Sequence, residues 1–342
     1  EKGFINNLRG SAEPRHRYRK SDFEAAVKKL ETDIPDAKSR SGRVKELEAA
    51  HPHVMVMRNE VDRKAFILKR GQYDDKGEEV DPGLPEAFSP VPGGESLTRL
   101  DLARWLVDGE HPLTSRVFVN RIWEQFFGTG IVKSSENLGR QSDWPSHPQL
   151  LDWIAVDFVE SGWDVKELIR AIVMSRAYRQ SSIIVEERLQ HDPENRLLSR
   201  GPRTRLQAEM LRDQALFLSG LLVERVGGPS WWVYQPAGLW LEVEKRGTFV
   251  QDHGEKLYRR SLYSRIRRTV APPSMLLFDM PSREMCSVKR TLTNTPLQAL
   301  ALLNEVTYVE AAKKFAERMM TKGGTPGERI AWGFRCATSR VA

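Results

Sequence analysis

The residues whose types and spacing most clearly suggest a chemical role are the cations between Lys256 and Arg268. This stretch contains no acidic residue, and Tyr258 and Tyr263 lie between its basic positions. Basic side chains that alternate with aromatic rings on a strand can hold single-stranded nucleic acid or an anionic polysaccharide, through charge and stacking. The alternative is a strand whose arginines pair with acids from elsewhere in the fold. The candidate anion-binding residues are Arg259, Arg260, Arg265, Arg267 and Arg268.

Arginines also occur inside segments whose apolar spacing is helical. A guanidinium group beside a hydrophobic core needs a carboxylate or carbonyl partner, because an unpaired buried charge is costly. Two interpretations follow: a polar network that locks one helix to the next, which we prefer, or a polar pocket between helices. The candidate polar residues from these segments are Arg116, Asn120, Arg179 and Arg205.

The stretch FDMPSREMCSVKRTLTNTP, residues 278–296, is typical of a polar loop that leads into a capped helix. Loops supported by rigid helices often carry function, so a site is expected here first. The nearby cations Arg283, Lys289 and Arg290 would favour a reactive thiolate at Cys286, and a buried, inert thiol is the alternative. The candidates in this loop are Asp279, Arg283, Glu284 and Cys286.

The familiar motifs of metal, nucleotide and serine-nucleophile chemistry are missing from the sequence. Its seven histidines form no HExxH pair, and there is no Walker A loop, no GxGxxG after a strand and no GxSxG elbow. The two cysteines, Cys286 and Cys336, form neither a CxxC zinc pair nor a CxxCH haem attachment. We expect them as one disulfide or as two buried free thiols. No metal and no cofactor are expected in this chain.

The composition is that of a globular protein. Of the 342 residues, 40% are hydrophobic and 29% are charged, which is enough chain for one large domain or two ordinary ones. No run of about 18 apolar residues occurs, so no transmembrane segment is expected. The net charge of +7 is spread among many acids. It favours acidic partners only weakly, and the interspersed acids count against nucleic acid.

The first part of the chain differs from the rest in composition. Residues 1–53 are polar and predict a charged helical arm, with a capping box at Ser21 and Glu24 and a second helix over 41–50. The apolar runs 54–57 and 65–68 predict two strands in a small antiparallel pair. Residues 71–94 are rich in Gly, Pro and acids, which predicts an extended surface connection and a domain boundary.

From residue 96 onwards the apolar spacing predicts mainly helices, among them 96–107, 206–222, 311–319 and 330–337. Helix starts are expected at Thr114 or Ser115, Ser146, Asp164 and Thr295, and helix ends at Gly128, Gly130 and Gly162. The helix after Thr114 or Ser115 should have its apolar face at Phe118, Ile122, Trp123 and Phe126, and the helix after Ser146 a buried stripe at Leu151, Ile154, Ala155 and Phe158. The last helix start should be followed by an apolar side at Leu297, Leu300, Ala301 and Leu303. Residues 257–270 alternate and predict a strand, with Leu262, Ile266 and Val270 on an inner face and Tyr263, Arg265 and Arg267 on the other. The fold class is therefore mainly α: a multi-helix globular domain with a few short β-strands in small antiparallel pairs and long ordered loops.

Many of these stretches resemble the DUF1553, or PSD1, domain family of planctomycetes and related bacteria, in order from about Val54 to near the C-terminus. The resemblance is carried by RLDLARWLV (99–107), HPLTSRVFVNRIWEQFFGTGIV (111–132), PSHPQLLDWIAVDFVESGWDVKELIRAIVMSRAYRQSS (145–182) and DPENRLLSRGPRTRLQAEMLRD (192–213). It continues in GGPSWWVYQPAGLW, LYRRSLY, PPSMLLFDMPSREMC and RTLTNTPLQALALLN. One departure is NEVTYVEAA, where the family more often has Asn-Asp-Pro.

The resemblance implies a domain of unknown function, and no catalytic residue is carried over from it. Such domains usually follow a DUF1549 domain in large exported proteins, often with a cytochrome c-type domain upstream. The chain would then be the C-terminal part of a periplasmic or cell-surface protein, with covalent haem only in a missing upstream domain. The expected organisation is a charged arm or end of the preceding region at 1–53, a β pair with a Pro/Gly-rich connection at 54–95, and a DUF1553-like helical domain at 96–342.

Three functions are weighed. The preferred one is a structural or interaction module, with the upstream DUF1549 and cytochrome c-type domains as partners. The alternative is binding or processing of anionic (sulfated) polysaccharide through the basic strand 256–268 and the tryptophans Trp231, Trp232 and Trp240. Nucleic-acid binding rests on net charge alone, and an exported location would count against it. Whether the chain is an enzyme stays open.

Overall fold

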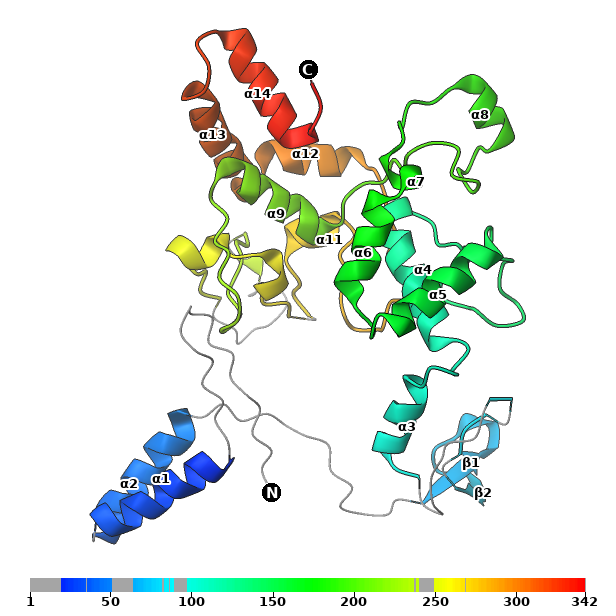
Figure 1. Ribbon diagram of the computed structural model, residues 1–342. Helices are drawn as coiled ribbons and strands as arrows, with labels where there is room; N and C mark the ends of the chain where they lie inside the picture. The colour runs from blue at the N-terminus through cyan, green and yellow to red at the C-terminus, as the bar shows by residue number, and fades with distance from the viewer. Residues whose placement is uncertain are drawn as a thin grey trace. The chain divides into compact units, whose positions relative to one another are not determined.

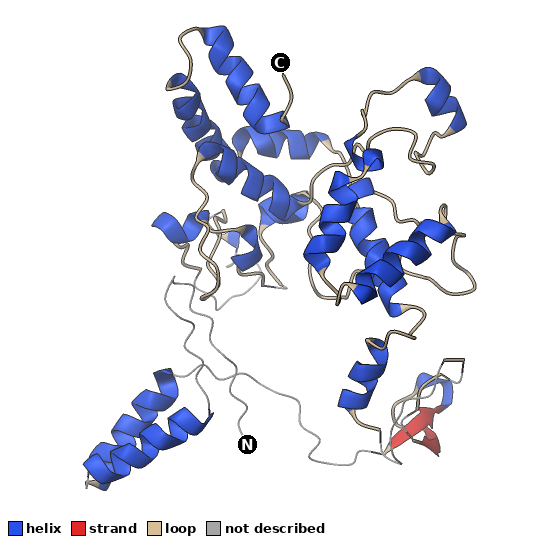
Figure 2. Cartoon of the chain, viewed as in Figure 1, coloured by secondary structure: helices blue, strands red, loops and turns tan. Residues whose placement is uncertain are grey.

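The computed structural model describes residues 20–34, 36–50, 64–81, 83–85, 87–88, 97–236, 238–239, 249–267 and 269–341. Helices dominate these ranges, and the sheet found in them has two short antiparallel strands (Figures 1 and 2). The expected fold class is thus confirmed. The chain forms two compact units. Unit 1 contains Glu1–Asp62, Gln207–Ser282 and Thr293–Ala342, and unit 2 contains Arg63–Leu206 and Arg283–Leu292.

The charged N-terminal segment forms a helical hairpin of α1 (Lys20–Asp33) and α2 (Ala37–Ala50), which pack side by side (Figure 1). α1 includes Lys20, one residue before the helix start expected at Ser21. α2 begins earlier than expected because Asp36 caps it, accepting a 2.8 Å hydrogen bond from the Ser39 amide. The hydrogen bonds from Ser39 also lower the pKa of Asp36.

The sheet pairs β1 (Ala65–Leu68) with β2 (Lys76–Val80). The expectation that 71–94 is only an extended connection is therefore wrong for β2, and the expected partner strand, 54–57, lies outside the described residues. β2 has the polar sequence KGEEV, so it has no apolar pattern that would mark it as a strand. Pairing depends instead on Gly77, where a Cβ would lie 2.8 Å from a carbonyl oxygen of β1.

Unit 2 is mainly helical. Its helices are α3 (Arg99–Leu106), α4 (Thr114–Phe127), α5 (Pro148–Glu160), α6 (Val165–Met174), α7 (Arg176–Arg179) and α8 (Glu186–His191). α4 packs against both α5 and α6. The expected apolar stripe of α5 is confirmed, with Leu151, Ile154, Ala155 and Phe158 buried. On α4 the buried side is rotated from the expected one, so that its centre lies at Val119, Asn120, Trp123 and Phe127.

Two expected helix caps in unit 2 are wrong. Neither Thr114 nor Ser115 caps α4 with its side chain; the imidazole of His111 accepts hydrogen bonds from the amides at the start of the helix instead. α5 begins one residue later than expected, because the Ser146 amide donates 2.9 Å to the carbonyl of Ile131 and belongs to the preceding loop. A distant backbone partner and a histidine cap are both outside the usual N-cap pattern.

Unit 1 gathers α9 (Ala208–Ser219), the 3₁₀ turns η2 (Gly254–Tyr258) and η3 (Ser261–Tyr263), α11 (Pro273–Leu277), α12 (Pro296–Asn304), α13 (Val306–Met320) and α14 (Pro326–Thr338). α13 packs against α9, and α14 folds back along α13 (Figure 1). The helices expected over 206–222, 311–319 and 330–337 are confirmed. The core lies beneath them and includes Trp231, Val233, Met275, Phe278 and Tyr308.

The strand expected over 257–270 is wrong. The segment forms the turns η2 and η3, and its strand-like contacts are two isolated bridges. The carbonyls of Leu257 and Arg259 accept hydrogen bonds of 2.6 and 3.0 Å from the guanidinium of Arg212. That side chain satisfies backbone groups that a neighbouring strand would otherwise satisfy. Leu262, expected on the inner face, is 76% exposed.

α12 begins as expected, with Thr295 and Gln298 in a capping box and a proline at the first helical position. Of the expected apolar side, Ala301 packs against the core of unit 1, but a polar residue is the one most deeply buried. Gln298 is 4% exposed and donates 2.9 Å to a carbonyl at the end of α11. The leucines that were expected to be buried are exposed: Leu297, Leu300 and Leu303.

Candidate functional site

A buried arginine organises the region where the anion-binding residues were expected. Arg212 on α9 is 6% exposed, and its guanidinium lies 4.5 Å from the ring of Trp231. Its Nη atoms donate to the carbonyls of Leu257 and Arg259 and to Oγ of Ser261. Burial lowers the pKa of Arg212 to about 10, so the side chain is still a cation at neutral pH.

Arg259 faces inward and is used to hold a loop. It is 5% exposed, and its Nη atoms donate to the carbonyls of Pro229, Gly227 and Arg225 at 2.7, 2.5 and 3.2 Å. Its cation lies 4.1 Å from the ring centre of Tyr263. With these contacts the guanidinium has little capacity left for a ligand anion, although its buried Nε has no hydrogen-bond partner among the described residues.

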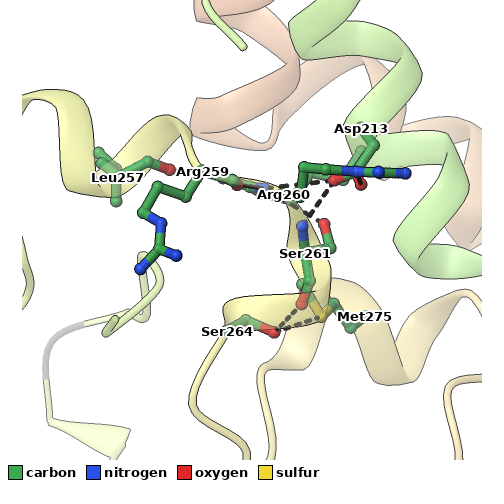
Figure 3. Close-up of polar contacts among 8 residues, drawn as sticks. Asp213, Leu257, Arg259, Arg260, Ser261, Ser264 and Met275 are labelled. Carbon is green, nitrogen blue, oxygen red and sulfur yellow. Dashed lines mark hydrogen bonds and ion pairs between the residues drawn. The ribbon is translucent and has the colours of Figure 1, made fainter. Parts of the chain in front are cut away.

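Arg260, the next residue, points in a different direction (Figure 3). Its side chain is 60% exposed, and its Nε lies 3.5 Å from a carboxylate oxygen of Asp213 on α9. The same carboxylate accepts a 2.7 Å hydrogen bond from the Ser261 amide. Asp213 therefore fixes the η3 turn through the backbone and pairs with Arg260 at the surface, where such a pair contributes little to stability.

Arg265 presents a cation at the surface of unit 1. It is exposed, and its guanidinium lies 4.4 Å from the ring centre of Trp232. Within the described ranges this guanidinium donates no hydrogen bond. Its main-chain amide donates 2.8 Å to the carbonyl of Trp231, which fixes its position. Of the remaining candidates, Arg267 is partly buried, whereas Arg268 and Trp240 lie outside the described residues.

In unit 2, Arg116 and Asn120 lie on α4 and have separate partners. Arg116 bridges to α5, with its Nε 2.7 Å from Oδ1 of Asp152. Asn120 is fully buried: its Oδ1 accepts from the Val132 amide at 2.8 Å, and its Nδ2 donates to the Val132 carbonyl and to Ser135 Oγ, both at 3.0 Å. The amide of Asn120 thus fixes the loop after α4.

Asp279 closes the loop in which a site was expected. Its carboxylate accepts from the amide and the hydroxyl of Thr293, at 2.8 and 2.9 Å, and so joins the two ends of that loop. Asp279 belongs to unit 1, whereas the other seven polar candidates belong to unit 2. Arg205 is half-buried and donates to the Leu206 carbonyl at 3.0 Å. The exposed candidates are Arg179, Arg283, Glu284 and Cys286.

Both cysteines, Cys286 and Cys336, are free and exposed. Each expected state, a disulfide or two buried thiols, is therefore wrong. Cys286 lies at the exposed end of the loop that Asp279 closes, and Cys336 lies on α14. Neither cysteine belongs to the hydrophobic core of its unit.

Sequence reasoning missed two arginines that serve the same purpose as Arg259. Arg196 donates to the carbonyls of Gly130 and Ile131 at 2.7 and 3.1 Å. Arg200, 8% exposed, donates to the carbonyls of Asp192 and Pro193 at 2.8 and 2.7 Å. The density of Arg, Asn, Pro and Gly in DPENRLLSRGPR indicated an ordered loop, and buried carbonyls in such a loop require donors.

An ion pair joins the segment Arg283–Leu292, which belongs to unit 2, to α4. Nζ of Lys289 lies 3.1 Å from Oε1 of Glu124, whose side chain is 9% exposed. The same Nζ lies 3.4 Å from the carbonyl of Lys133. A buried carboxylate needs such a partner, so this pair anchors the segment Arg283–Leu292. The pattern of apolar residues around Glu124 gave no indication of it.

A pocket in unit 1 and a pocket in unit 2 differ greatly in volume. The pocket in unit 1 has a volume of about 610 Å³, which is ligand-sized, but its cation, Arg318, donates to the carbonyls of Phe217 and Leu218 at the end of α9. The pocket in unit 2, beside Ser146 and His147, has about 20 Å³, room for one water molecule. Its size excludes a substrate.

In the described part of the chain, no three His, Cys, Asp or Glu side chains are grouped so that they could hold a metal ion. Across the same residues, no helix combines the length and the apolar character needed to cross a membrane. The buried polar side chains described above therefore hold loops, and a few cations are exposed.

The family model "PSD1: Protein of unknown function (DUF1553)" matches residues 98–342. The match covers α3 to α14, and therefore most of both units. Searches of curated proteins and of solved structures each found no match.

Proposed function

Because the chain belongs to the PSD1 (DUF1553) family of proteins of unknown function, we propose that it acts as a non-catalytic interaction module. The observation that carries this proposal is the use of the buried polar side chains. Asn120, Arg212 and Arg259 all bind main-chain groups of their own unit. Catalytic groups, in contrast, point into a cavity that admits a substrate.

The partners we propose are the DUF1549 and cytochrome c-type domains that accompany such modules in exported planctomycete proteins. The apolar side chains exposed on α12 support an interaction role, since apolar residues gathered on a surface often mark a protein contact. Leu297, Leu300 and Leu303 are 56%, 55% and 75% exposed. We propose that the DUF1549 domain buries them.

The test is binding between this chain and a separately produced DUF1549 domain from a full-length family member, measured by calorimetry. We expect a complex that the double substitution Leu300→Ser and Leu303→Ser weakens. Leu262→Ser is the matched control, because Leu262 is 76% exposed and lies outside α12. Absence of a complex would contradict the proposed partner. Turnover by the purified chain on a panel of glycans and esters would contradict the non-catalytic role.

A second candidate function is the binding of an anionic, sulfated polysaccharide by unit 1. One observation favours it: Arg265 is exposed and stacked on Trp232, and its guanidinium has no hydrogen-bond acceptor within the described ranges. The inward position of Arg259 counts against a broad basic strand, so the binding surface would be smaller than the sequence suggested.

A further inference from the structure

We propose that Arg265, held over the ring of Trp232, recognises the sulfate or carboxylate groups of an anionic polysaccharide, with Lys256 as a second contact. This proposal rests on the second candidate function and assigns it to particular residues. A guanidinium that lies on an aromatic ring uses its face for the ring and keeps its in-plane N–H groups for acceptors. Two parallel N–H groups match the two oxygens of a carboxylate or sulfate.

Neighbouring arginines do not offer the same group. The Nη atoms of Arg259 donate to three carbonyls inside unit 1, and the side chain is 5% exposed. Arg260 is exposed, but its Nε already lies 3.5 Å from the carboxylate of Asp213. Arg265 differs from both because its guanidinium lies over a ring and, within the described ranges, donates no hydrogen bond, so its donors remain available.

The stack is held from both sides, so the cation is positioned before a ligand arrives. The Trp232 amide donates 2.8 Å to Asp252 Oδ2, and Phe249 packs edge-on against the indole with ring centres 5.6 Å apart. On the other side, the Arg265 amide donates 2.8 Å to the Trp231 carbonyl. A fixed cation loses less conformational entropy on binding than a mobile one.

Lys256 supplies the second positive charge of this surface. Its Nζ lies 3.4 Å from Oδ1 of Asp252, the residue that also accepts from the Trp232 amide. Its side chain is 69% exposed, so the pairing with Asp252 is a surface contact that a ligand can replace. Arg265 and Lys256 are thus linked through Trp232 and Asp252. Two cations on one surface suit a polymer that carries several anionic groups.

The stack also favours a polysaccharide over single-stranded nucleic acid. Proteins that bind single strands stack bases on open aromatic faces. In unit 1 the guanidinium of Arg265 covers a face of Trp232, so that face is closed to a base. Recognition through charged oxygens, without stacking, is what a sulfated or carboxylated glycan requires.

The experiment uses the full chain with three probes: heparin oligosaccharide, polygalacturonate and oligo-dT, and neutral dextran as the blank. Calorimetry at two salt concentrations should give binding to one or both glycans that weakens with salt. Arg265→Met, which keeps most of the packing on the indole, should weaken binding about tenfold. Arg260→Met is the matched control and should change affinity less than about twofold. Circular dichroism shows whether each variant is folded.

The outcomes separate the two proposals. If the unaltered chain binds neither glycan, the polysaccharide function itself is overturned, and this assignment with it. If the chain binds a glycan and Arg265→Met binds equally well, the assignment to Arg265 is wrong while the function survives. Tighter binding to oligo-dT than to either glycan would replace the proposed ligand class. Should Arg265→Met not fold, Arg265→Lys provides the same comparison, because lysine keeps the charge and lacks the two-pronged donor.

Discussion

The guanidinium of Arg212 stacks 4.5 Å from the ring of Trp231, and both side chains are buried. The stack orients the cation so that its N–H groups reach the carbonyls of Leu257 and Arg259. One side chain from α9 thereby fixes two consecutive turns of a segment that, among the described residues, makes only isolated bridges and pairs with no strand. In place of the expected basic strand, the segment forms two turns whose carbonyls Arg212 satisfies.

The two adjacent arginines of that loop should respond differently to substitution. Arg259→Met removes the donors to three carbonyls and should lower the free energy of unfolding by about 2–4 kcal/mol. Arg260→Met removes a surface contact and should change it by less than about 0.5 kcal/mol. Urea unfolding followed by near-ultraviolet circular dichroism measures both. Equal effects would show that Arg259 is not an anchor.

Asn120 should be among the least replaceable residues of unit 2. Asn120→Ala leaves the buried amide of Val132 without an acceptor, so the free energy of unfolding should fall by about 2–4 kcal/mol. Arg121→Ala on the same helix is the control, since Arg121 is exposed and should cost less than about 0.5 kcal/mol. A loss at Asn120 as small as that of the control would contradict the assigned hydrogen bonds.

Gly128 and Gly162 form a matched pair for the cost of a side chain in the left-handed conformation. Their φ angles are 80° and 76°, and a Cβ at Gly162 would meet open space, whereas one at Gly128 would overlap the methyl group of Thr204. Gly162→Ala should lower the free energy of unfolding by about 1 kcal/mol, and Gly128→Ala should lower it by at least about 1 kcal/mol more. Thermal unfolding measures the difference. Adding Thr204→Ser to Gly128→Ala removes the overlapping methyl group and should recover part of the lost free energy of unfolding.

The start of α14 should weaken in acid. The Glu328 carboxylate accepts hydrogen bonds from the Thr325 amide and hydroxyl and from the Gly324 amide, and these lower the pKa of Glu328 below its usual 4.5. A folded-state pKa below the unfolded one means that the stabilisation is complete above about pH 4.5 and is lost as the pH falls through the folded-state value. The amide chemical shift of Thr325 should follow this titration. In Glu328→Gln the acid step should disappear; its persistence would point to another group.

Predictions that rest on neighbouring residues were the most successful. The apolar stripe of α5 from Leu151 to Phe158, the Asp164 cap of α6 and the Thr295 cap of α12 all depend on residues within a few positions of one another. Helix periodicity and capping are properties of such short stretches, so the sequence displays them directly. The mainly α fold class follows from them.

Predictions that depend on distant partners failed. Residues 257–270 have a strand pattern, but their carbonyls are satisfied by Arg212, which lies 45 positions from Leu257 in the sequence. Arg259 and Arg260 are indistinguishable by type and neighbourhood. Their difference arises from where the carbonyl of Pro229 and the carboxylate of Asp213 lie in space. Which arginine faces a ligand could therefore not be read from the chain.

The arginine anchors have a consequence for how these loops can change. Arg196, Arg200 and Arg259 donate mainly to main-chain carbonyls, which every amino acid provides. The side chains of the anchored loops are therefore exchangeable as long as the path of the backbone and the arginine itself are kept. Substitutions in loops of this kind can therefore change the side chains exposed at the surface while the path of the backbone stays the same.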